Sequence, residues 1–196
     1  MFSFGFSSTY LAFVEPHLKP TDNIDVPKFN ILHRINCRDK RNSEGVLLLG
    51  KENSGLSDVP TIETYFGDKG PNDHCLISRW RINDKTVLML YKSPKFSKPD
   101  FLQHLSTRLE QETGDLIVFG DININLRGPE GKQVRLLFSK FKLTSKLNLQ
   151  DFSTDEGTNI DCCFSNLNGL DAWFYESYYS YHKAICIVWP KVHVNS

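Results

Sequence analysis

The sequence has no excess of charge of either sign, because lysine plus arginine and aspartate plus glutamate number 23 each. Sequence-independent affinity for nucleic acid grows with the number of phosphates that basic side chains neutralise. A net charge of zero therefore argues against strong non-specific binding to nucleic acid. Local basic patches remain within residues 34–41, 92–98 and 127–135, and a solvated loop is the plainer explanation of each one.

Long apolar runs and paired cysteines are also missing. No apolar run approaches the roughly 20 residues that a helix needs to span a bilayer. Residues 1–13 are apolar and aromatic, but they have neither a basic start nor a small-residue cleavage site, so we do not expect a signal peptide. The 5 cysteines form no CxxC pair of the zinc-binding kind, and their spacing does not suggest a disulfide framework. We expect a reducing, intracellular setting.

Repeats, low-complexity segments and linkers are absent from the sequence, and 196 residues suit one domain with a sizeable core. We therefore expect a single domain over residues 1–196. Short apolar runs that end at glycine, proline or polar residues predict strands. These runs lie near residues 10–14, 29–32, 45–50, 61–66, 75–82, 86–91, 115–119, 158–164 and 182–188.

Two segments have apolar residues at helical spacing. Residues 98–112 are the clearest case, with Asp100 as the expected cap, and residues 133–141 predict a second helix. The first helix stands between two apolar strands. This strand–helix–strand order is typical of a crossover that joins two parallel neighbours in a sheet.

The strand over residues 115–119 runs directly into Gly120-Asp121-Ile122-Asn123. Glycine lets the backbone turn sharply or approach a ligand closely. Asp121 and Asn123 therefore belong at the end of a buried strand, where polar side chains can point into a cleft. An Asx turn that closes the strand is the alternative explanation, since both residues are common in turns.

Other strand ends carry chemistry-bearing residues as well. Glu15, Tyr91 and His182 stand where apolar runs end or begin, and Asp161 lies within one. Carboxylates suit Mg²⁺, which prefers oxygen ligands, and a carboxylate beside a histidine fixes the tautomer of the ring. A buried carboxylate such as Asp161 needs a partner. For Glu15, a polar residue that marks the exit of a strand into solvent is the alternative.

The order of these residues resembles the endonuclease/exonuclease/phosphatase family, which has the DNase I-like fold. The matching segments are Val14-Glu15, Tyr91-Lys92-Ser93-Pro94, Gly120-Asp121-Ile122-Asn123, Asn159-Ile160-Asp161 and Ser180-Tyr181-His182. They extend over residues 10–188, which is nearly the whole chain. In detail the chain is most similar to the endonuclease domains of mobile elements, both non-LTR retrotransposons and Helitron-like elements.

The resemblance implies an α+β fold, a two-sheet αββα sandwich with its site at one edge between the sheets. It also implies hydrolysis of phosphodiesters or phosphomonoesters with Mg²⁺ or Mn²⁺, and DNA as the partner. By position, Glu15 would be a metal ligand, Asp121 would orient or deprotonate the attacking water, and Asn123 would hold the phosphate or that water.

The remaining positions concern the substrate phosphate. The resemblance implies that Asp161 pairs with His182, which contacts the scissile phosphate, and that Tyr91 donates a hydrogen bond to a phosphate oxygen. Lys92 and Arg127, in the basic patches beside Tyr91 and after Asn123, would steer the phosphate backbone. Charge builds on the phosphoryl oxygens during the reaction, so a metal with fixed donors is the expected machinery.

Two features depart from the family pattern. The family usually closes on Ser-Asp-His, whereas Tyr181 holds the middle position here, and a phenol with an ordinary pKa of about 10 is a poor Mg²⁺ ligand at neutral pH. Family members also begin with a strand and a helix before the strand that carries the glutamate, and only fourteen residues precede Glu15. We therefore expect a domain that lacks the usual first strand and helix.

Three functions are compatible with these features. The first is a Mg²⁺-dependent DNA endonuclease-like domain of mobile-element origin, nuclear in that case, with activity that Tyr181 and the short N-terminus impair. The second is a catalytically inactive module that binds nucleic acid or protein through the same fold. The third is a phosphatase or lipid phosphodiesterase, although nothing in the sequence specifies a small headgroup.

Overall fold

The computed structural model describes residues 10–14, 21–35, 46–51, 60–70, 73–176 and 180–189. The chain divides into two compact units, Met1–Pro60 and Thr61–Ser196. The expectation of a single domain remains a prediction. Neither of the two helices in the described part of the chain has the length and apolar character that a membrane crossing requires.

The first unit contains a three-stranded antiparallel sheet in the order β1-β3-β2. The strands are β1 (Tyr10–Val14), β2 (Asn30–Ile35) and β3 (Val46–Gly50). Every residue of the central strand β3 is buried, as its unbroken apolar run predicts. Glu15, the predicted metal ligand that follows β1, lies outside the described residues.

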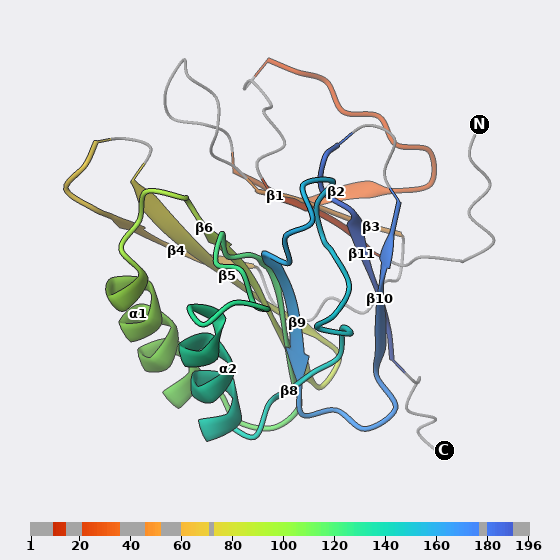
Figure 1. The fold of residues 1–196 in the computed structure, drawn as a ribbon. Coiled ribbons are helices and arrows are strands. Elements are labelled where there is room, and N and C mark those ends of the chain that lie inside the picture. Colours follow the sequence, from red (N-terminus) through yellow and green to blue (C-terminus); the bar gives the residue numbers. More distant parts are fainter. Residues whose placement is uncertain are drawn as a thin grey trace. The chain divides into compact units, whose positions relative to one another are not determined.

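The second unit contains a six-stranded mixed sheet in the order β4-β5-β6-β7-β9-β8 (Figure 1). The strands are β4 (Thr61–Phe66), β5 (His74–Ile82), β6 (Lys85–Lys92), β7 (Leu116–Asp121), β8 (Thr144–Ser145) and β9 (Asp161–Ser165). Strands β6 and β7 are parallel, and the other neighbours are antiparallel. The predicted crossover between two parallel strands is therefore confirmed.

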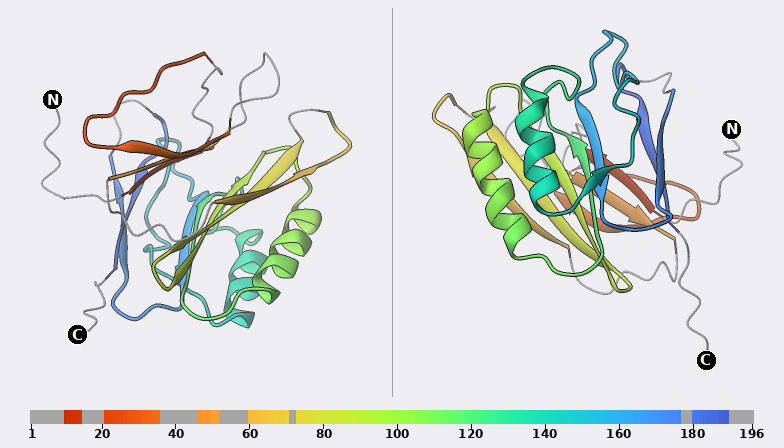
Figure 2. Two further views of the ribbon diagram at one scale, coloured as in Figure 1. Left: turned by 180° about the vertical axis from the view of Figure 1, so that it is seen from behind. Right: turned by 60° about the horizontal axis from the view of Figure 1, so that its bottom comes forward.

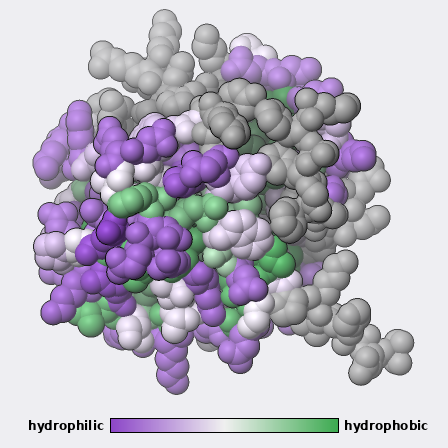
Figure 3. All heavy atoms as spheres, turned by 45° about the vertical axis from the view of Figure 1, so that its right-hand side comes forward, coloured by the Kyte–Doolittle hydropathy of each residue, from purple (hydrophilic) through white to green (hydrophobic). Residues whose placement is uncertain are grey.

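A separate antiparallel pair follows, β10 (Asp171–Tyr175) with β11 (Ala184–Val188). No residue of these two strands is buried, although most are apolar. Figure 3 shows hydrophobic residues at the surface among hydrophilic ones. Strand β11 begins two residues later than predicted, so His182 stands just before it.

Both helices lie side by side on one face of the six-stranded sheet (Figure 2). They are α1 (Lys98–Glu110) and α2 (Gly131–Lys140). The prediction of Asp100 as the cap of α1 is wrong, because the Ser97 hydroxyl is the cap and accepts a hydrogen bond from the Asp100 amide. Asp100 lies in the first turn, where its negative charge favours the positive end of the helix.

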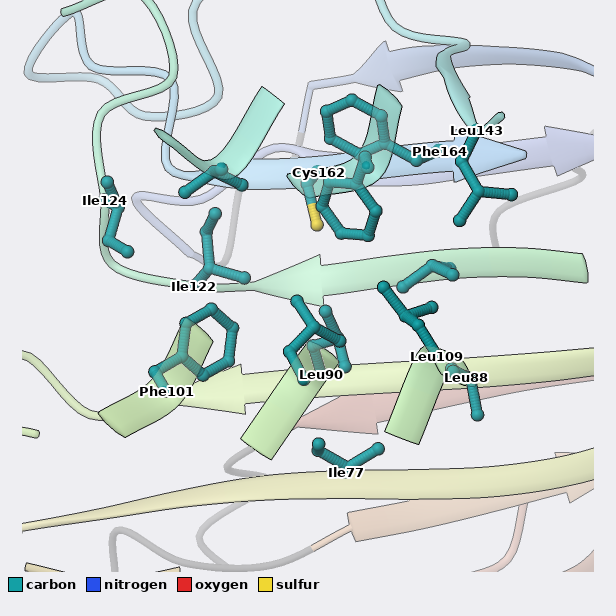
Figure 4. Packing of buried hydrophobic residues seen from close by; sticks show 14 of the residues in the cluster. Ile77, Leu88, Leu90, Phe101, Leu109, Ile122, Ile124, Leu143, Cys162 and Phe164 are labelled. Atoms are coloured by element: carbon teal, nitrogen blue, oxygen red, sulfur yellow. The ribbon is translucent and has the colours of Figure 1, made fainter. Parts of the chain in front are cut away.

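The main core lies between these helices and the sheet. Phe101 and Leu109 of α1 point toward Ile77, Leu88 and Leu90 of the sheet (Figure 4). Alternate residues of the strands point away from the helices, and among them Leu76, Trp80 and Met89 are buried too. In the central strands, residues on both faces of the sheet are therefore shielded from solvent.

Phe138 of α2 contributes strongly to this core. It is fully buried, and its ring stacks on Phe164 of β9 with centroids 4.1 Å apart. We expect Phe138→Ala to lower the free energy of unfolding by about 4 kcal/mol, because a large cavity remains. Leu136→Ala, on the exposed side of the same helix, should change it by less than about 0.5 kcal/mol. Urea denaturation of both variants tests this difference, and equal losses would contradict the packing described.

The cysteines of the sheet are protected thiols. Burial raises the pKa of Cys75 and of Cys163 to about 12 and raises that of Cys162 as well. Since the thiolate is the reactive form, we expect all three to resist N-ethylmaleimide in the native protein from pH 7 to 9, and to react fully in urea. Mass spectrometry of peptides would report the labelling. Rapid native labelling of these three sites would show that the sheet opens readily.

Candidate active site

Three polar residues form a row across one end of the six-stranded sheet. Tyr91 of β6 pairs in register with Asp121 of β7, which pairs with Asp161 of β9. Residues that pair directly in a sheet lie on the same face. The preceding row contains Leu90 and Cys162, which belong to the core beneath the helices. The row with the two carboxylates therefore points to the opposite face, away from the helices.

Gly120 allows β6 and β7 to approach each other at this end. Its φ is +141°, and a Cβ atom placed on it would lie 1.9 Å from the carbonyl oxygen of Leu90. The sequence indicates a sharp turn or a close approach to a ligand at this glycine, whereas the close approach in the structure is to the backbone of the neighbouring strand. Because the next residue is Asp121, this close approach also sets the position of the carboxylate.

We expect Gly120→Ala to destabilise the protein by about 4 kcal/mol, because the methyl group meets backbone atoms that cannot move aside. Gly114→Ala is the matched control. Its φ is +81°, and no atom lies within 4 Å of the added Cβ. That variant should lose only about 1 kcal/mol from backbone strain. Chemical denaturation of both proteins would reveal the difference, and a Gly120 variant as stable as the control would contradict this geometry.

Asp121 and Asn123 form an Asx turn. The Asn123 amide N–H donates to Asp121 Oδ1 at 2.9 Å, and Asn123 adopts a φ of +48°. The Asn123 side-chain nitrogen donates to Asp121 Oδ2 at 3.1 Å and to the Lys92 carbonyl at 2.9 Å. These bonds engage both hydrogens of the side-chain amide. The turn that the sequence offered as an alternative is thus present, and it holds both oxygens of the Asp121 carboxylate.

Asp161 and His182 form a close pair beside that carboxylate. His182 Nδ1 lies 2.8 Å from Asp161 Oδ2, and His182 Nε2 lies 3.7 Å from Asp121 Oδ2. An ionised carboxylate can only accept, so Nδ1 carries the hydrogen of this bond. The side chains of Asp121, Asp161 and His182 retain 14, 10 and 20% exposure, so they are shielded but reachable from solvent.

Ser153 positions this pair, and sequence reasoning missed it. The fully buried Ser153 hydroxyl accepts hydrogen bonds from the amides of Ile160 and Asp161, and its carbonyl accepts one from Lys183. The neighbouring Thr154 forms a β-bridge with His182. No signal in a single sequence distinguishes this serine from the other small polar residues of the loop.

The strand predicted over residues 158–164 is shorter than expected. Strand β9 begins at Asp161, because the backbone before it bonds to loops instead of to a sheet. The Asn159 and Ile160 carbonyls accept from Leu126 and Ile122. Asp161 is therefore the first residue of its strand, and its side chain lies at the end of the sheet where β7 finishes.

One group among the described residues has the composition of a metal site. Asp121, Asp161 and His182 each offer a ligand atom, and these atoms lie within 4.8 Å of one another. Two carboxylates supply the hard oxygen ligands that a divalent cation prefers, so the donor set fits such an ion. Asp161 Oδ2 and His182 Nδ1 already engage each other, which leaves the Asp121 carboxylate as the main anionic ligand.

The other predicted residues have different surroundings. Tyr91 is buried, with its ring 5.5 Å from the ring of His74. Lys92 is buried too, its Nζ donates to the Ser93 carbonyl, and burial lowers its pKa. A buried amine cannot steer a nucleic-acid backbone from solvent, so the position of Lys92 does not fit the steering role expected of it. Arg127 is exposed, and its guanidinium lies over the ring of Phe152.

No protein-family model matches the sequence, and no curated protein matches it either. Solved structures do match. An endonuclease/exonuclease/phosphatase family protein from Leptotrichia buccalis superposes with a TM-score of 0.58 at 13% identity, over 92% of this chain and 88% of that one. A cytolethal distending toxin from Actinobacillus actinomycetemcomitans gives 0.58 at 10% identity, over 92% and 85%.

A third match is a mannosyl-6-phosphatase from Bacteroides thetaiotaomicron, with a TM-score of 0.51 at 14% identity, over 84% of this chain and 78% of that one. Identities this low establish the fold alone. The chain has the endonuclease/exonuclease/phosphatase fold, its described residues form antiparallel and mixed sheets with two helices, and the predicted fold is confirmed at that level. The finer expectation of a sandwich without its first strand and helix, and that of a mobile-element origin, remain predictions.

Proposed function

We propose that this protein is a metal-dependent phosphodiesterase, an endonuclease-like hydrolase whose reaction centre is the cluster of Asp121, Asp161 and His182. The observation that carries the proposal is the pairing of His182 Nδ1 with Asp161 Oδ2 at 2.8 Å, with the second ring nitrogen 3.7 Å from Asp121. Two carboxylates that share one imidazole in a shielded place lose hydration and repel each other, and such arrangements cluster at functional sites.

His182 is the group that contacts the scissile phosphate. Asp161 holds the ring in one orientation and favours its positively charged form. The Nε2 hydrogen of that form donates to a phosphoryl oxygen, where negative charge grows in the transition state. Asp161 acts through the histidine and is therefore a positioning residue.

Asp121 is the group that orients and deprotonates the attacking water. A general base must present a fixed lone pair to the water, and the two bonds from Asn123 fix the plane of this carboxylate. Asn123 was expected to hold the phosphate or the water. Both of its amide hydrogens are engaged with Asp121 and the Lys92 carbonyl, so we assign it the role of positioning Asp121.

The Asp121 carboxylate would hold a divalent cation, Mg²⁺ or Mn²⁺. The proposal of Glu15 as a metal ligand is supported by its place in the ordered motifs of the sequence. When bound, such an ion supplies positive charge to the phosphoryl oxygens and lowers the pKa of a bound water. Tyr91, the register neighbour of Asp121, is proposed to donate a hydrogen bond to the phosphate. DNA as the substrate and a mobile element as the origin are part of the proposal, supported by the ordered motifs in the sequence.

A second candidate is a non-catalytic module that binds nucleic acid or protein. Tyr181 favours it, because the phenol stands where the family has a carboxylate and its ring lies 4.3 Å from the ring of His182. This candidate predicts binding without hydrolysis.

Nicking of supercoiled plasmid distinguishes the two. Purified protein is incubated with Mg²⁺, with Mn²⁺ or with EDTA, beside Asp121→Ala, His182→Ala and the exposed control Asp171→Ala. The enzyme proposal expects metal-dependent nicking by the wild type and the control and none by the two site variants. Absence of nicking by a folded wild type that still binds DNA supports the module, and nicking that survives in both site variants overturns the assigned centre.

A further inference from the structure

Arg127 lies in a turn that directly follows the proposed reaction centre along the chain. It is exposed and is the sixth residue after Asp121. Its amide donates to Asn125 Oδ1 at 3.1 Å, and the Gly128 amide donates to the Asn125 carbonyl at 3.2 Å. These bonds fix the backbone of the turn, so the arginine side chain starts from a defined point.

The same turn is bonded to the segment that carries Asp161. The Leu126 amide donates to the Asn159 carbonyl at 2.7 Å, and the Asn159 amide donates to Asn125 Oδ1 at 3.4 Å. Asn159 is fully buried and stands two residues before Asp161, a backbone span of at most about 7 Å. The turn with Arg127 therefore lies beside the end of the sheet where the reaction centre stands.

Phe152 approaches the same place from another segment. The carbonyl of the preceding Asp151 accepts a hydrogen bond from the Asn159 side-chain nitrogen at 2.9 Å. Thr154 pairs with His182, and side chains two residues apart along an extended chain lie on one side of it. Phe152 therefore lies on the side of this pairing that carries His182. Its side chain is 43% exposed, so it forms part of the surface beside the centre.

The side chains of Arg127 and Phe152 are in contact. The guanidinium carbon lies 4.5 Å from the centre of the ring. The aromatic face attracts the cation and holds it in one place without neutralising its charge. Because the ring offers no oxygen acceptor, the N–H donors of the guanidinium remain available to a ligand. The planar fork of these donors matches the oxygens of a phosphate.

The carboxylates of the neighbouring loop do not neutralise this arginine. Asp151, Asp155 and Glu156 are exposed on the same loop as Phe152. Among the residues that the structure describes, none of the three forms an ion pair with Arg127. They repel a phosphate on either side of the guanidinium, whereas the guanidinium attracts one. This arrangement favours one anion at one position over a broad basic surface, in keeping with the net charge of zero.

We propose that Arg127, held by the ring of Phe152, binds a second phosphate of the substrate strand, which flanks the phosphate at His182. The substrate class is then a nucleic-acid chain with neighbouring phosphodiesters and not an isolated phosphate ester. The inference rests on the proposed phosphodiesterase function and deepens it. Arg127 contacts the substrate, and Phe152 is a positioning residue because it acts through Arg127.

The salt dependence of binding tests the contact without any hydrolysis. Fluorescence anisotropy is measured in EDTA with a labelled duplex of twelve base pairs over a range of KCl concentrations. Arg127→Ala should reduce the slope of log affinity against log salt by about 0.9, the value for one lost phosphate contact on a duplex. Lys140→Ala is the matched control. It removes one positive charge from the exposed end of α2, and its slope should equal that of the wild type.

A double-mutant comparison tests the role of Phe152. Phe152→Leu should weaken duplex binding by about threefold in the wild type, because the cation loses its aromatic support. The same change should have no effect in the Arg127→Ala protein, since the ring acts only through the guanidinium. Phe152→Tyr keeps an aromatic face and should retain wild-type affinity. A merely structural role of the ring would weaken binding equally with and without Arg127.

Competition against the labelled duplex tests the requirement for a chain. The dinucleotide pTpT carries two phosphates, and the mononucleotide pT carries one. We expect pTpT to compete about tenfold better than pT for the wild type, because one more charge-assisted contact forms. That advantage should shrink for Arg127→Ala. Equal competition by the two nucleotides would overturn the assignment of a flanking phosphate.

The remaining outcomes separate this inference from the proposed activity. A slope that Arg127→Ala leaves unchanged, or that Lys140→Ala reduces equally, overturns the phosphate contact even if the protein nicks plasmid. Losses from Phe152→Leu that persist without Arg127 overturn the positioning role of the ring. Binding that follows all these expectations in a protein that never nicks supports the phosphate contact and overturns the phosphodiesterase proposal instead.

Discussion

Asp121→Asn is expected to lower the rate of metal-dependent plasmid nicking by about 10⁴-fold, which is the upper range for the loss of a general base. The amide has nearly the same shape as the carboxylate, so it occupies the same place at the end of β7. It cannot take a proton from water, and it offers no negative charge to a divalent cation. The initial rate of conversion of supercoiled to nicked DNA measures the loss.

The same variant should bind DNA at least as well as the wild type, because a negative charge near the phosphate has been removed. Asp171→Asn, at the exposed first residue of β10, removes one negative charge from the same unit and should leave the nicking rate unchanged. A folded Asp121→Asn protein that retains more than a tenth of the wild-type nicking rate would show that Asp121 is not the general base.

Asp161→Asn is expected to lower the nicking rate by about 10³-fold. The asparagine side-chain oxygen can still accept the hydrogen bond from His182 Nδ1, but it carries no charge to stabilise the protonated ring. The rate at saturating substrate should therefore fall while the Michaelis constant changes little.

The stability of this variant must be measured beside its activity. Asp161 also holds backbone bonds through its amide to Ser153, and the substitution leaves those in place. We therefore expect an urea midpoint close to that of the wild type. A lower rate accompanied by an equal fall in the urea midpoint would mean that Asp161 supports the fold and does not act through His182.

The strand-end residues were predictable because their signal is local. The run that becomes β7 is apolar and unbroken, and Gly120 followed by Asp121 and Asn123 marks its end in the sequence as clearly as in the structure. The parallel pairing of β6 and β7 followed from the single helix between them. These features depend on residues that are neighbours in the chain, so physical rules for short segments describe them well.

Features that depend on distant contacts were not predictable. Ser153 has its role because residues 160, 161 and 183 converge on it in space, and nothing in its own surroundings in the sequence indicates this. Lys92 was expected in a solvated patch, yet it is buried at the end of β6, where its Nζ donates to the Ser93 carbonyl. The two-residue strand β8 is too short to have any periodicity.

The most direct test of the proposed centre is a double-mutant cycle of Asp161→Asn and His182→Gln, read as the rate of Mg²⁺-dependent plasmid nicking. If the two residues act as one unit, the double variant is no slower than the slower single variant, because the first change already removes what the pair provides. If the two losses multiply, or if the wild type shows no metal-dependent nicking, the Asp161–His182 pair is not the reactive unit proposed.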